Sequence, residues 1–308
     1  MMQPASVSHF RTLEDLGAEG ILGVLDRADA LKRLRGTSAH PRPLAGRSVV
    51  ILLEKASTRT RLSFEIGVAE LGGTPLTLIA KDTQMGRGEP LADTARMLSG
   101  YAHAVVYRTF GHDRVEELAA NATIPVINGL SARYHPCQLL ADLQTMREAL
   151  GGIEGKRVAW IGDGNNMAHS WMLAAALLGF ELRVASPEGY APEREVLERA
   201  AAIGGGRVLL TQDPAEAAEG ADVVTTDVFA SMGQEEEAKA RLAAFAGFIV
   251  DPALMARAAE GAIFLHCLPA HRGEEVEAEV IDGPASRVWD EAENRLHAQK
   301  ALLERLMA

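Results

Sequence analysis

Short apolar runs alternate along the chain with segments whose apolar residues recur every three or four positions. An uninterrupted apolar run rich in β-branched residues predicts a buried strand, and the second spacing predicts a helix packed along one face. After a helical pattern over 8–36, the first half yields the following predictions. Strands are expected at 47–54, 75–79, 103–107 and 124–127, and helices at 58–71, 91–101, 112–120 and 136–150.

The same alternation resumes after Gly151 and Gly152. Strands are expected at 156–161, 181–186, 207–210, 222–226, 246–250 and 262–266, and helices at 166–179, 192–203 and 213–219. Strand–helix alternation predicts parallel sheets with helices on both faces. The fold class is therefore α/β, with two doubly wound parallel-sheet domains that meet near residue 150 and are joined by a long helix.

Composition narrows the classes of function. The chain has 308 residues and a formal net charge of -11, so an overall basic surface for nucleic acid is not expected. The apolar runs are too short for a membrane span, and residues 1–10 lack a secretory signal pattern. Its two cysteines, Cys137 and Cys267, make no disulfide framework. We expect a cytoplasmic protein.

The segment from Ser57 to Arg61 follows the first predicted strand and opens a predicted helix. A helix N-terminus offers unpaired backbone N–H groups and the positive end of the helix dipole to an anion. Ser57, Thr58 and Thr60 add hydroxyl donors, and Arg59 adds a forked cationic donor. The segment therefore predicts a phosphate site, although taken alone it also fits a capped helix with solvated arginines.

Two further groups of polar residues follow strands of the first half. Arg108 ends one strand, and His135 precedes Pro136 at the start of a helix that also carries Gln138. Arg108 can aim a guanidinium at a ligand beyond the strand, and His135 can donate one N–H to an oxygen. Singly, each also fits an ordinary role, as a solvated arginine or a capping histidine. We expect Cys137 to be buried filler.

In the second half, Gly162 and Gly164 follow a strand, but Met167 stands where a dinucleotide fingerprint requires its third glycine. We therefore predict no NAD site. The adjacent amides of Asn165 and Asn166 at the helix start suit a zwitterionic amino acid.

Two more strand ends carry polar groups. Asp227 can pair with a substrate ammonium, and Ser231 can offer a hydroxyl to a carboxylate. Cys267 ends a later strand, and Leu268-Pro269 is a candidate cis peptide, although a lone cysteine also fits an inert buried thiol. Metal-ligand spacings and a nucleotide-binding P-loop are absent from the sequence.

Five motifs in a fixed order resemble the aspartate/ornithine transcarbamoylase family over essentially the whole chain. They are Ser57-Thr58-Arg59-Thr60, Arg108, His135-Pro136-Cys137-Gln138, Asp227 with Ser231-Met232-Gly233, and His266-Cys267-Leu268-Pro269. The last two loops are similar to those of the members that use ornithine.

The resemblance implies carbamoyl transfer from carbamoyl phosphate to the δ-amine of L-ornithine, giving citrulline and phosphate in arginine metabolism. It implies a carbamoyl-phosphate-binding domain at 1–150, with the helix 291–308 packing back on it, and an ornithine-binding domain at 151–290. The residues it assigns to carbamoyl phosphate are Ser57, Thr58, Arg59, Thr60, Gln84, Arg108, His135, Gln138, Cys267, Leu268 and Arg295. Those it assigns to ornithine are Asn166, Asp227, Ser231 and Met232, and the catalytic residues would be Arg108, His135, Asp227 and Cys267.

The resemblance also implies a homotrimer, or an assembly of trimers, in which Gln84 reaches a neighbouring subunit's site. It implies no cofactor, no metal, and no nucleic-acid or membrane partner. Two alternatives remain open. In the first, the acceptor is another amine: N-acetylornithine, putrescine or aspartate. In the second, the chain is a non-catalytic phosphate-binding paralogue.

Overall fold

The computed structural model describes residues 8–230 and 238–307, which form two compact units. One unit comprises Met1–Leu140 with Asn294–Ala308, and the other comprises Ala141–Glu293. The chain crosses between them inside two helices, α5 (Pro136–Leu150) and α12 (Val288–Met307). Each unit is described separately below.

The first unit contains a four-stranded parallel sheet in the order β2-β1-β3-β4. Its strands are β1 (Ser48–Leu53), β2 (Thr74–Ile79), β3 (Ala104–Arg108) and β4 (Val126–Leu130). Its other helices are α1 (Gly17–Leu34), α2 (Thr58–Glu70), α3 (Leu91–Tyr101) and α4 (His112–Asn121), with 3-10 turns η1 (Leu13–Asp15), η2 (Ala80–Asp82) and η3 (Gln84–Arg87).

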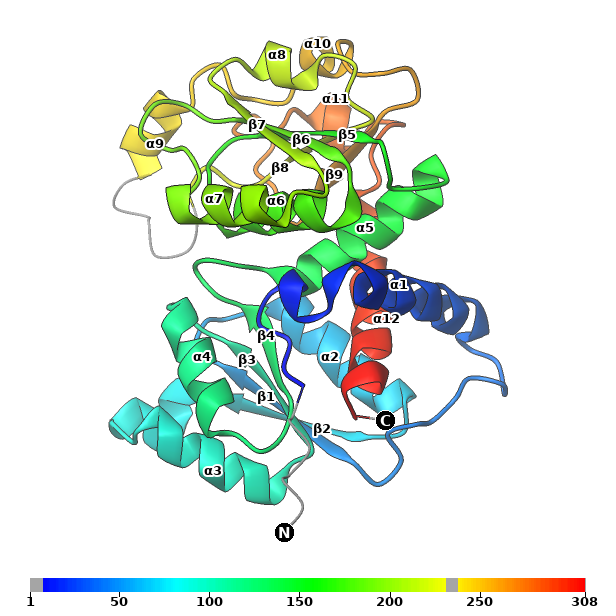
Figure 1. Ribbon diagram of the computed structural model, residues 1–308, viewed down its shortest axis with the longest axis vertical. Helices are drawn as coiled ribbons and strands as arrows, with labels where there is room; N and C mark the ends of the chain where they lie inside the picture. The colour runs from blue at the N-terminus through cyan, green and yellow to red at the C-terminus, as the bar shows by residue number, and fades with distance from the viewer. Residues whose placement is uncertain (1–7, 231–237, 308) are drawn as a thin grey trace. The chain divides into compact units, whose positions relative to one another are not determined.

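Successive residues of a strand point to opposite faces, and in β1 and β3 nearly all of them are buried. One face, which includes Val50 and Leu52, packs against α3 and α4 in a single apolar cluster. Figure 1 shows α3 and α4 on one side of this sheet and α2 on the other. Two-sided burial explains why these strands read as continuous apolar runs rather than as alternating ones.

The second unit contains a five-stranded parallel sheet in the order β7-β6-β5-β8-β9. Its strands are β5 (Arg157–Ile161), β6 (Glu181–Ala185), β7 (Arg207–Thr211), β8 (Val223–Thr226) and β9 (Ile263–His266). Its helices are α6 (Asn166–Leu178), α7 (Arg194–Ile203), α8 (Pro214–Ala218), α9 (Ala238–Ala244), α10 (Pro252–Met255) and α11 (Ala278–Ile281). Within this unit, α6 and α7 cover one face of the sheet, and α8, α10 and α11 lie on the other (Figure 1).

The α/β prediction with two parallel sheets is confirmed, and one predicted strand is wrong. The segment 246–250 joins neither sheet, and its Val250 forms only an isolated bridge with Val276. Gly247 has φ +90, which turns the backbone out of the extended region. Phe248 and Val250 are buried in the apolar core instead. The apolar composition of 246–250 therefore reflects burial and not pairing in a sheet.

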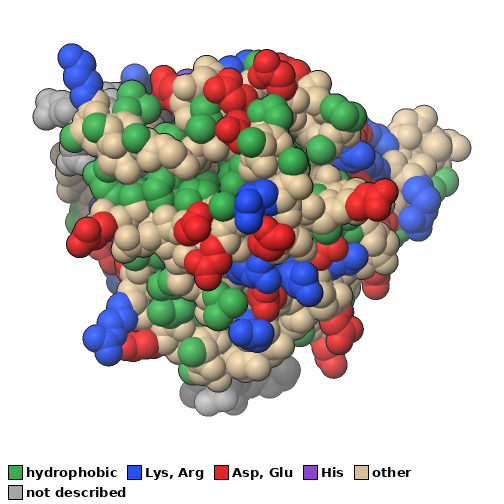
Figure 2. Space-filling model, turned by 90° about the horizontal axis from the view of Figure 1, so that it is seen from above, with side chains coloured by type: hydrophobic (Ala, Val, Ile, Leu, Met, Phe, Trp, Pro, Cys, Tyr) green, Lys and Arg blue, Asp and Glu red, His purple; other side chains and the backbone are tan. Residues whose placement is uncertain are grey.

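Parallel strands place all their carboxyl ends at one edge of a sheet, which is where α/β proteins bind ligands. In the first unit β1 and β3 end just before or at the predicted phosphate-site residues, and in the second unit β5, β8 and β9 end just before the other predicted residues. On the face drawn in Figure 2, acidic and basic side chains are interspersed. Within residues 8–230 and 238–307, none of the helices has the length and apolar content needed to cross a bilayer.

Candidate active site

In the first unit, the predicted site residues gather at the N-terminus of α2. Ser57 is its N-cap, and its hydroxyl accepts a hydrogen bond from the backbone N–H of Thr60 at 3.2 Å. Thr58 is exposed and Arg59 is partly buried. The cap fixes the first turn, so the remaining N–H groups and the hydroxyls meet an incoming anion in a prearranged geometry.

Arg108, at the end of β3, joins this turn. Its Nη1 donates to the Thr60 hydroxyl at 3.2 Å, and both side chains are buried. The Arg108 carbonyl accepts the Glu54 N–H at 2.9 Å, which ties the ends of β3 and β1 together. Arg108 and the first turn of α2 are therefore neighbours in the structure.

His135, Gln138 and Arg295 form a buried group in the same unit. Arg295 Nη1 donates to Gln138 Oε1 at 2.6 Å. Burial holds the pKa of His135 well below its usual value, and the positive charges of Arg295, Arg108 and Arg59 lower it further. His135 is therefore a neutral imidazole, which can donate one N–H to a carbonyl oxygen without carrying charge.

Arg295 is held by a second amide. With the Gln299 side chain oriented to satisfy its neighbours, its oxygen accepts from Arg295 Nε and Nη2 at 2.9 Å and its nitrogen donates to Ser63 at 2.7 Å. Ser63 lies on α2, so the fork of Arg295 on α12 is fixed relative to the predicted phosphate site.

Two neighbours of this group were not predicted as site residues. Glu54 accepts from Arg114 at 2.6 Å and from the Tyr107 hydroxyl at 2.7 Å, which buttresses the end of β1. Lys55 lies over the ring of Phe110, and burial together with the charge of Arg108 lowers its pKa. Lys55 lies close to the predicted Ser57 motif in the sequence, and this closeness is the one sequence feature that could have suggested it as a site residue.

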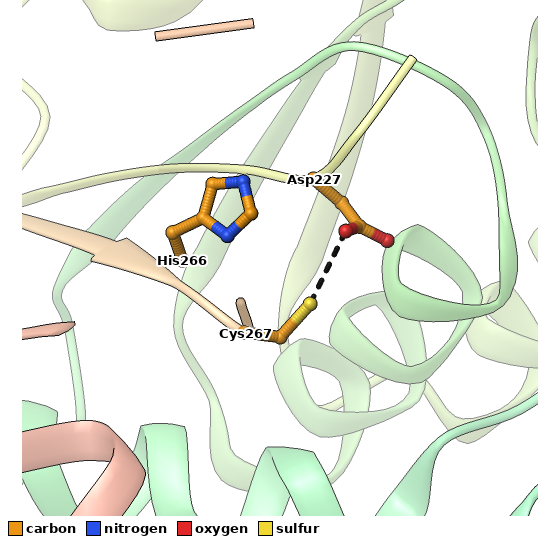
Figure 3. A group of neighbouring side chains, drawn as sticks. All are labelled: Asp227, His266 and Cys267. Atoms are coloured by element: carbon orange, nitrogen blue, oxygen red, sulfur yellow. Dashed lines mark hydrogen bonds between the residues drawn. The ribbon is translucent and has the colours of Figure 1, made fainter. Parts of the chain in front are cut away.

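In the second unit, a separate cluster is centred on Asp227, just after β8. Its Oδ2 accepts from Asn165 Nδ2 at 3.0 Å, and its Oδ1 accepts from the Cys267 thiol at 3.2 Å and from the Val228 N–H at 2.8 Å. Figure 3 shows the carboxylate of Asp227 facing the sulfur of Cys267. Three strand ends thus converge on one largely buried carboxylate.

Cys267 is a protonated thiol in this setting. Burial and the nearby carboxylates of Asp227 and Glu291 raise its pKa well above the usual value. A thiolate nucleophile is therefore disfavoured, and the thiol acts as a hydrogen-bond donor. Burial likewise raises the pKa of Cys137 to about 12, in agreement with the expected buried filler.

The Cys267 loop has an unusual backbone. The predicted cis peptide at Leu268-Pro269 is confirmed. Leu268 has φ 58, the single positive φ among the described residues other than glycine. Such backbone conformations persist where the surroundings over-determine them, and they concentrate at functional sites.

Arg241, on α9, is a further neighbour that sequence patterns did not reveal. Its buried guanidinium contacts the Asp163 carboxylate and donates to the Phe229 carbonyl. Burial raises the pKa of Asp163 to about 6 although Arg241 opposes the shift. Phe229 lies two residues beyond Asp227, so Arg241 fixes the chain that leaves the Asp227 site.

The remaining predicted residues differ in their placement. Asn166 opens α6, but its neighbour Asn165 makes the contact with Asp227. Gln84 is exposed in η3, where its backbone carbonyl accepts the N–H of Glu89. Ser231 and Met232 lie outside the described residues.

Two groups of side chains have metal-like spacing. The potential ligand atoms of Asp227, His266 and Cys267 lie within 4.8 Å of one another, as do those of His271, Glu274 and Glu275. In the first group the Cys267 thiol donates to Asp227, and His266 Nδ1 accepts from the Leu268 N–H at 2.9 Å. These ligand atoms already serve hydrogen bonds that shape the loop.

Known proteins resemble the chain over nearly its whole length. Residues 8–148 match the family model described as the carbamoyl-P binding domain of aspartate/ornithine carbamoyltransferase, and residues 154–306 match its Asp/Orn binding domain. The protein named ornithine carbamoyltransferase from Halorhodospira halophila is 59% identical over 97% of this chain and 98% of its own length. An anabolic ornithine carbamoyltransferase from Pseudomonas aeruginosa is 53% identical over 98% of this chain and 97% of its own length.

A solved structure agrees. The ornithine carbamoyltransferase from Pyrococcus furiosus superposes with a TM-score of 0.93 at 48% identity, covering 100% of this chain and 99% of its own. Because both halves of the sequence match and the structure follows the same fold, the chain belongs to the aspartate/ornithine carbamoyltransferase family.

Proposed function

We propose that the chain transfers the carbamoyl group of carbamoyl phosphate to the δ-amine of L-ornithine, forming L-citrulline and phosphate in arginine metabolism. The observation that carries the choice of acceptor is the convergence of Asn165 and Cys267 on the Asp227 carboxylate. A buried anion of this kind suits a substrate with a free ammonium. The relatives named ornithine carbamoyltransferase support the same acceptor.

Carbamoyl phosphate is assigned to residues 1–150 with the C-terminal helix 291–308. Its phosphate would be held by the α2 turn, through Ser57, Thr58, Arg59 and Thr60. The carbamoyl group would be held by Arg108, His135, Gln138 and Arg295. The hydrogen bond of Arg108 to Thr60 supports this division, because it joins the two groups of residues.

Ornithine is assigned to residues 151–290. Asp227 would pair with the α-ammonium, and Asn166, Ser231 and Met232 would hold the rest of the amino acid. Cys267 and Leu268 would lie beside the reacting δ-amine and the carbamoyl group. Because the Cys267 proton is donated to Asp227, its sulfur offers lone pairs to the amine.

The chemistry requires a neutral amine. The free δ-amine has a pKa of about 10.4 if it resembles lysine, and a site that desolvates it and accepts its N–H groups favours the uncharged form. Attack on the carbonyl carbon forms a tetrahedral oxyanion, which Thr60, Arg108 and neutral His135 stabilise with preorganised donors. Collapse breaks the C–O bond to phosphate, the attacking nitrogen gives one of its protons to a phosphate oxygen, and Arg59 with the α2 N-terminus holds the hydrogen-phosphate dianion that leaves.

The active assembly is proposed to be a homotrimer, or an assembly of trimers, in which Gln84 reaches a neighbouring subunit's site. Support comes from Leu62, Ile66 and Leu76, which are exposed apolar side chains on α2 and on the edge strand β2. Light scattering should give three times the chain mass of 32.9 kDa, or a multiple of that value. A monomer at micromolar concentration would contradict the trimer.

We further propose that the enzyme works in the cytoplasm without a cofactor, on small-molecule substrates alone. The two cysteines are free thiols, which suits a reducing compartment.

The proposed reaction is tested by its stoichiometry. Purified protein with carbamoyl phosphate and L-ornithine should release one phosphate for each citrulline formed. An Arg108→Met variant serves as the control, because it removes the donor that links Thr60 to the carbamoyl group. Phosphate release without citrulline, or phosphate binding without turnover, would refute the proposal.

A further inference from the structure

Glu275 is a fully buried carboxylate beneath the Cys267 loop. Its Oε1 accepts the backbone N–H of His271 at 2.5 Å and lies 3.3 Å from Nε2 of His266. His266 and His271 flank the segment 267–270, so one carboxylate oxygen faces both ends of the loop. Backbone hydrogen bonds with Val250 fix Glu275 in place, because Val250 pairs with its carbonyl at 2.9 Å and with the N–H of Glu277 at 3.0 Å.

The hydrogen bonds of His266 define its tautomer. Its Nδ1 accepts the Leu268 N–H at 2.9 Å, so in a neutral ring the proton sits on Nε2. Nε2 is the atom that faces Glu275, and both side chains are 0% exposed. A carboxylate beside Nε2 favours the N–H at that atom and leaves Nδ1 free to accept.

The acceptor at Nδ1 controls the loop backbone. Leu268 sits at φ 58, which costs an ordinary L-residue energy unless its surroundings hold it there. The bond from its N–H to His266 supplies such a hold. If the ring proton moved to Nδ1, two donors would face each other and Leu268 would lose that partner. Cys267, one residue earlier, would then no longer be aimed at Asp227.

We propose that Glu275 is a positioning residue: it fixes the tautomer of His266, and His266 in turn holds Leu268 and Cys267 in the geometry that completes the Asp227 site. This proposal rests on the proposed function, since the placement of Leu268 and Cys267 affects activity only if ornithine binds beside them. Glu275 acts through the imidazole of His266, which lies 3.3 Å from it and accepts the backbone N–H of Leu268.

The first test reads the tautomer in the wild-type chain without substrate. In protein labelled with ¹⁵N-histidine, long-range proton–nitrogen spectra separate the two ring nitrogens, and a His266→Asn variant assigns the signal. We expect the Nε2–H tautomer for His266 at neutral pH. An Nδ1–H tautomer would overturn the proposal whatever the variants do. Because no turnover is involved, a chain that made no citrulline would refute the proposed function and leave this result standing.

The second test uses a graded pair of variants. Glu275→Gln keeps an oxygen that can accept from both His271 and His266, so kcat/KM for ornithine should stay within about threefold of wild type. Glu275→Leu removes that oxygen, and kcat/KM for ornithine should fall by about 10-fold or more, towards the roughly 100-fold cost of a 1 Å misplacement. Glu274→Gln, at the exposed neighbouring residue, is the matched control and should leave kinetics unchanged.

Binding of inorganic phosphate separates positioning from general damage, because its predicted ligands lie on α2 in the other unit. Phosphate affinity should be unchanged in all three variants. A Glu275→Leu enzyme within threefold of wild type would overturn the proposal, as would an equal loss in phosphate binding. If Glu275→Leu does not fold, His266→Asn and His266→Leu take its place. The Asn oxygen can replace Nδ1 as acceptor, so equal losses in that pair would also overturn the proposal.

Discussion

Replacing Asp227 with Asn is the most informative single change at the proposed ornithine site. The substitution keeps the size of the side chain and removes its charge. Oδ1 accepts from Val228 and Cys267, and Oδ2 accepts from Asn165, so both carboxylate oxygens face hydrogen-bond donors. An Asn amide must turn its NH₂ group toward one of these donors, which loses a hydrogen bond as well as the ion pair with substrate.

The magnitude follows from the value of a hydrogen bond to a charged group, about 1.5–3 kcal/mol. Since about 1.4 kcal/mol corresponds to a factor of ten, kcat/KM for ornithine should fall by roughly 10- to 150-fold. Steady-state kinetics with varied ornithine at saturating carbamoyl phosphate measures the effect. Affinity for inorganic phosphate should be unchanged.

Asp290→Asn is the matched control, because it removes the same charge from an exposed position in the same unit. It should leave kcat/KM for ornithine within about twofold, since an exposed charge is screened by solvent and salt. The reasoning is refuted if Asp227→Asn stays within threefold of wild type. It is also refuted if Asp290→Asn reproduces the loss.

Three further predictions concern single groups. Ser57→Ala should lower the free energy of unfolding in urea by about 1 kcal/mol, the usual value of an N-cap, whereas Thr58→Ala should not, and equal losses would contradict the capping role. Ring-nitrogen NMR should show His135 titrating well below its ordinary pKa, and Arg295→Met should raise that pKa because a nearby positive charge is removed; ordinary titration in the wild type would contradict the reading. Iodoacetamide should alkylate Cys267 far more slowly than free cysteine at pH 7, because burial and Asp227 raise its pKa, and rapid alkylation would show that the thiolate is accessible.

Sequence patterns point to the strand ends as the candidate site, because ligands bind there in this fold class. Arg108 and Asp227 were predicted from their places after apolar runs, and both make contacts with other groups at strand ends. The amide that reaches Asp227 belongs to Asn165 and not to its neighbour Asn166, because Asn165 is the N-cap of α6. Its Oδ1 accepts from the backbone N–H groups of Met167 and Ala168, and its Nδ2 donates to Asp227. Adjacency in sequence could not decide between the two.

Other features depend on tertiary packing that no local pattern encodes. Glu275 and Arg241 reach their partners from outside the motifs, and nothing in the sequence around either marks it as buried. The segment 246–250 has the composition of a strand, yet its apolar side chains fill the core without sheet pairing. The spacing of apolar residues in the sequence predicts which residues are buried. Which residue a buried group contacts depends on the tertiary fold.

The central claim is the identity of the acceptor, and a parallel product assay tests it most directly. Purified protein with carbamoyl phosphate would be given L-ornithine, N-acetylornithine, putrescine or L-aspartate in separate reactions, with each carbamoylated product measured by mass spectrometry. The account predicts citrulline from ornithine and at most trace product from the other three. N-acetylornithine lacks the free α-ammonium that would pair with Asp227, putrescine lacks the carboxylate of ornithine, and L-aspartate lacks a second amine to be carbamoylated. Faster carbamoylation of any other acceptor than of ornithine would contradict it.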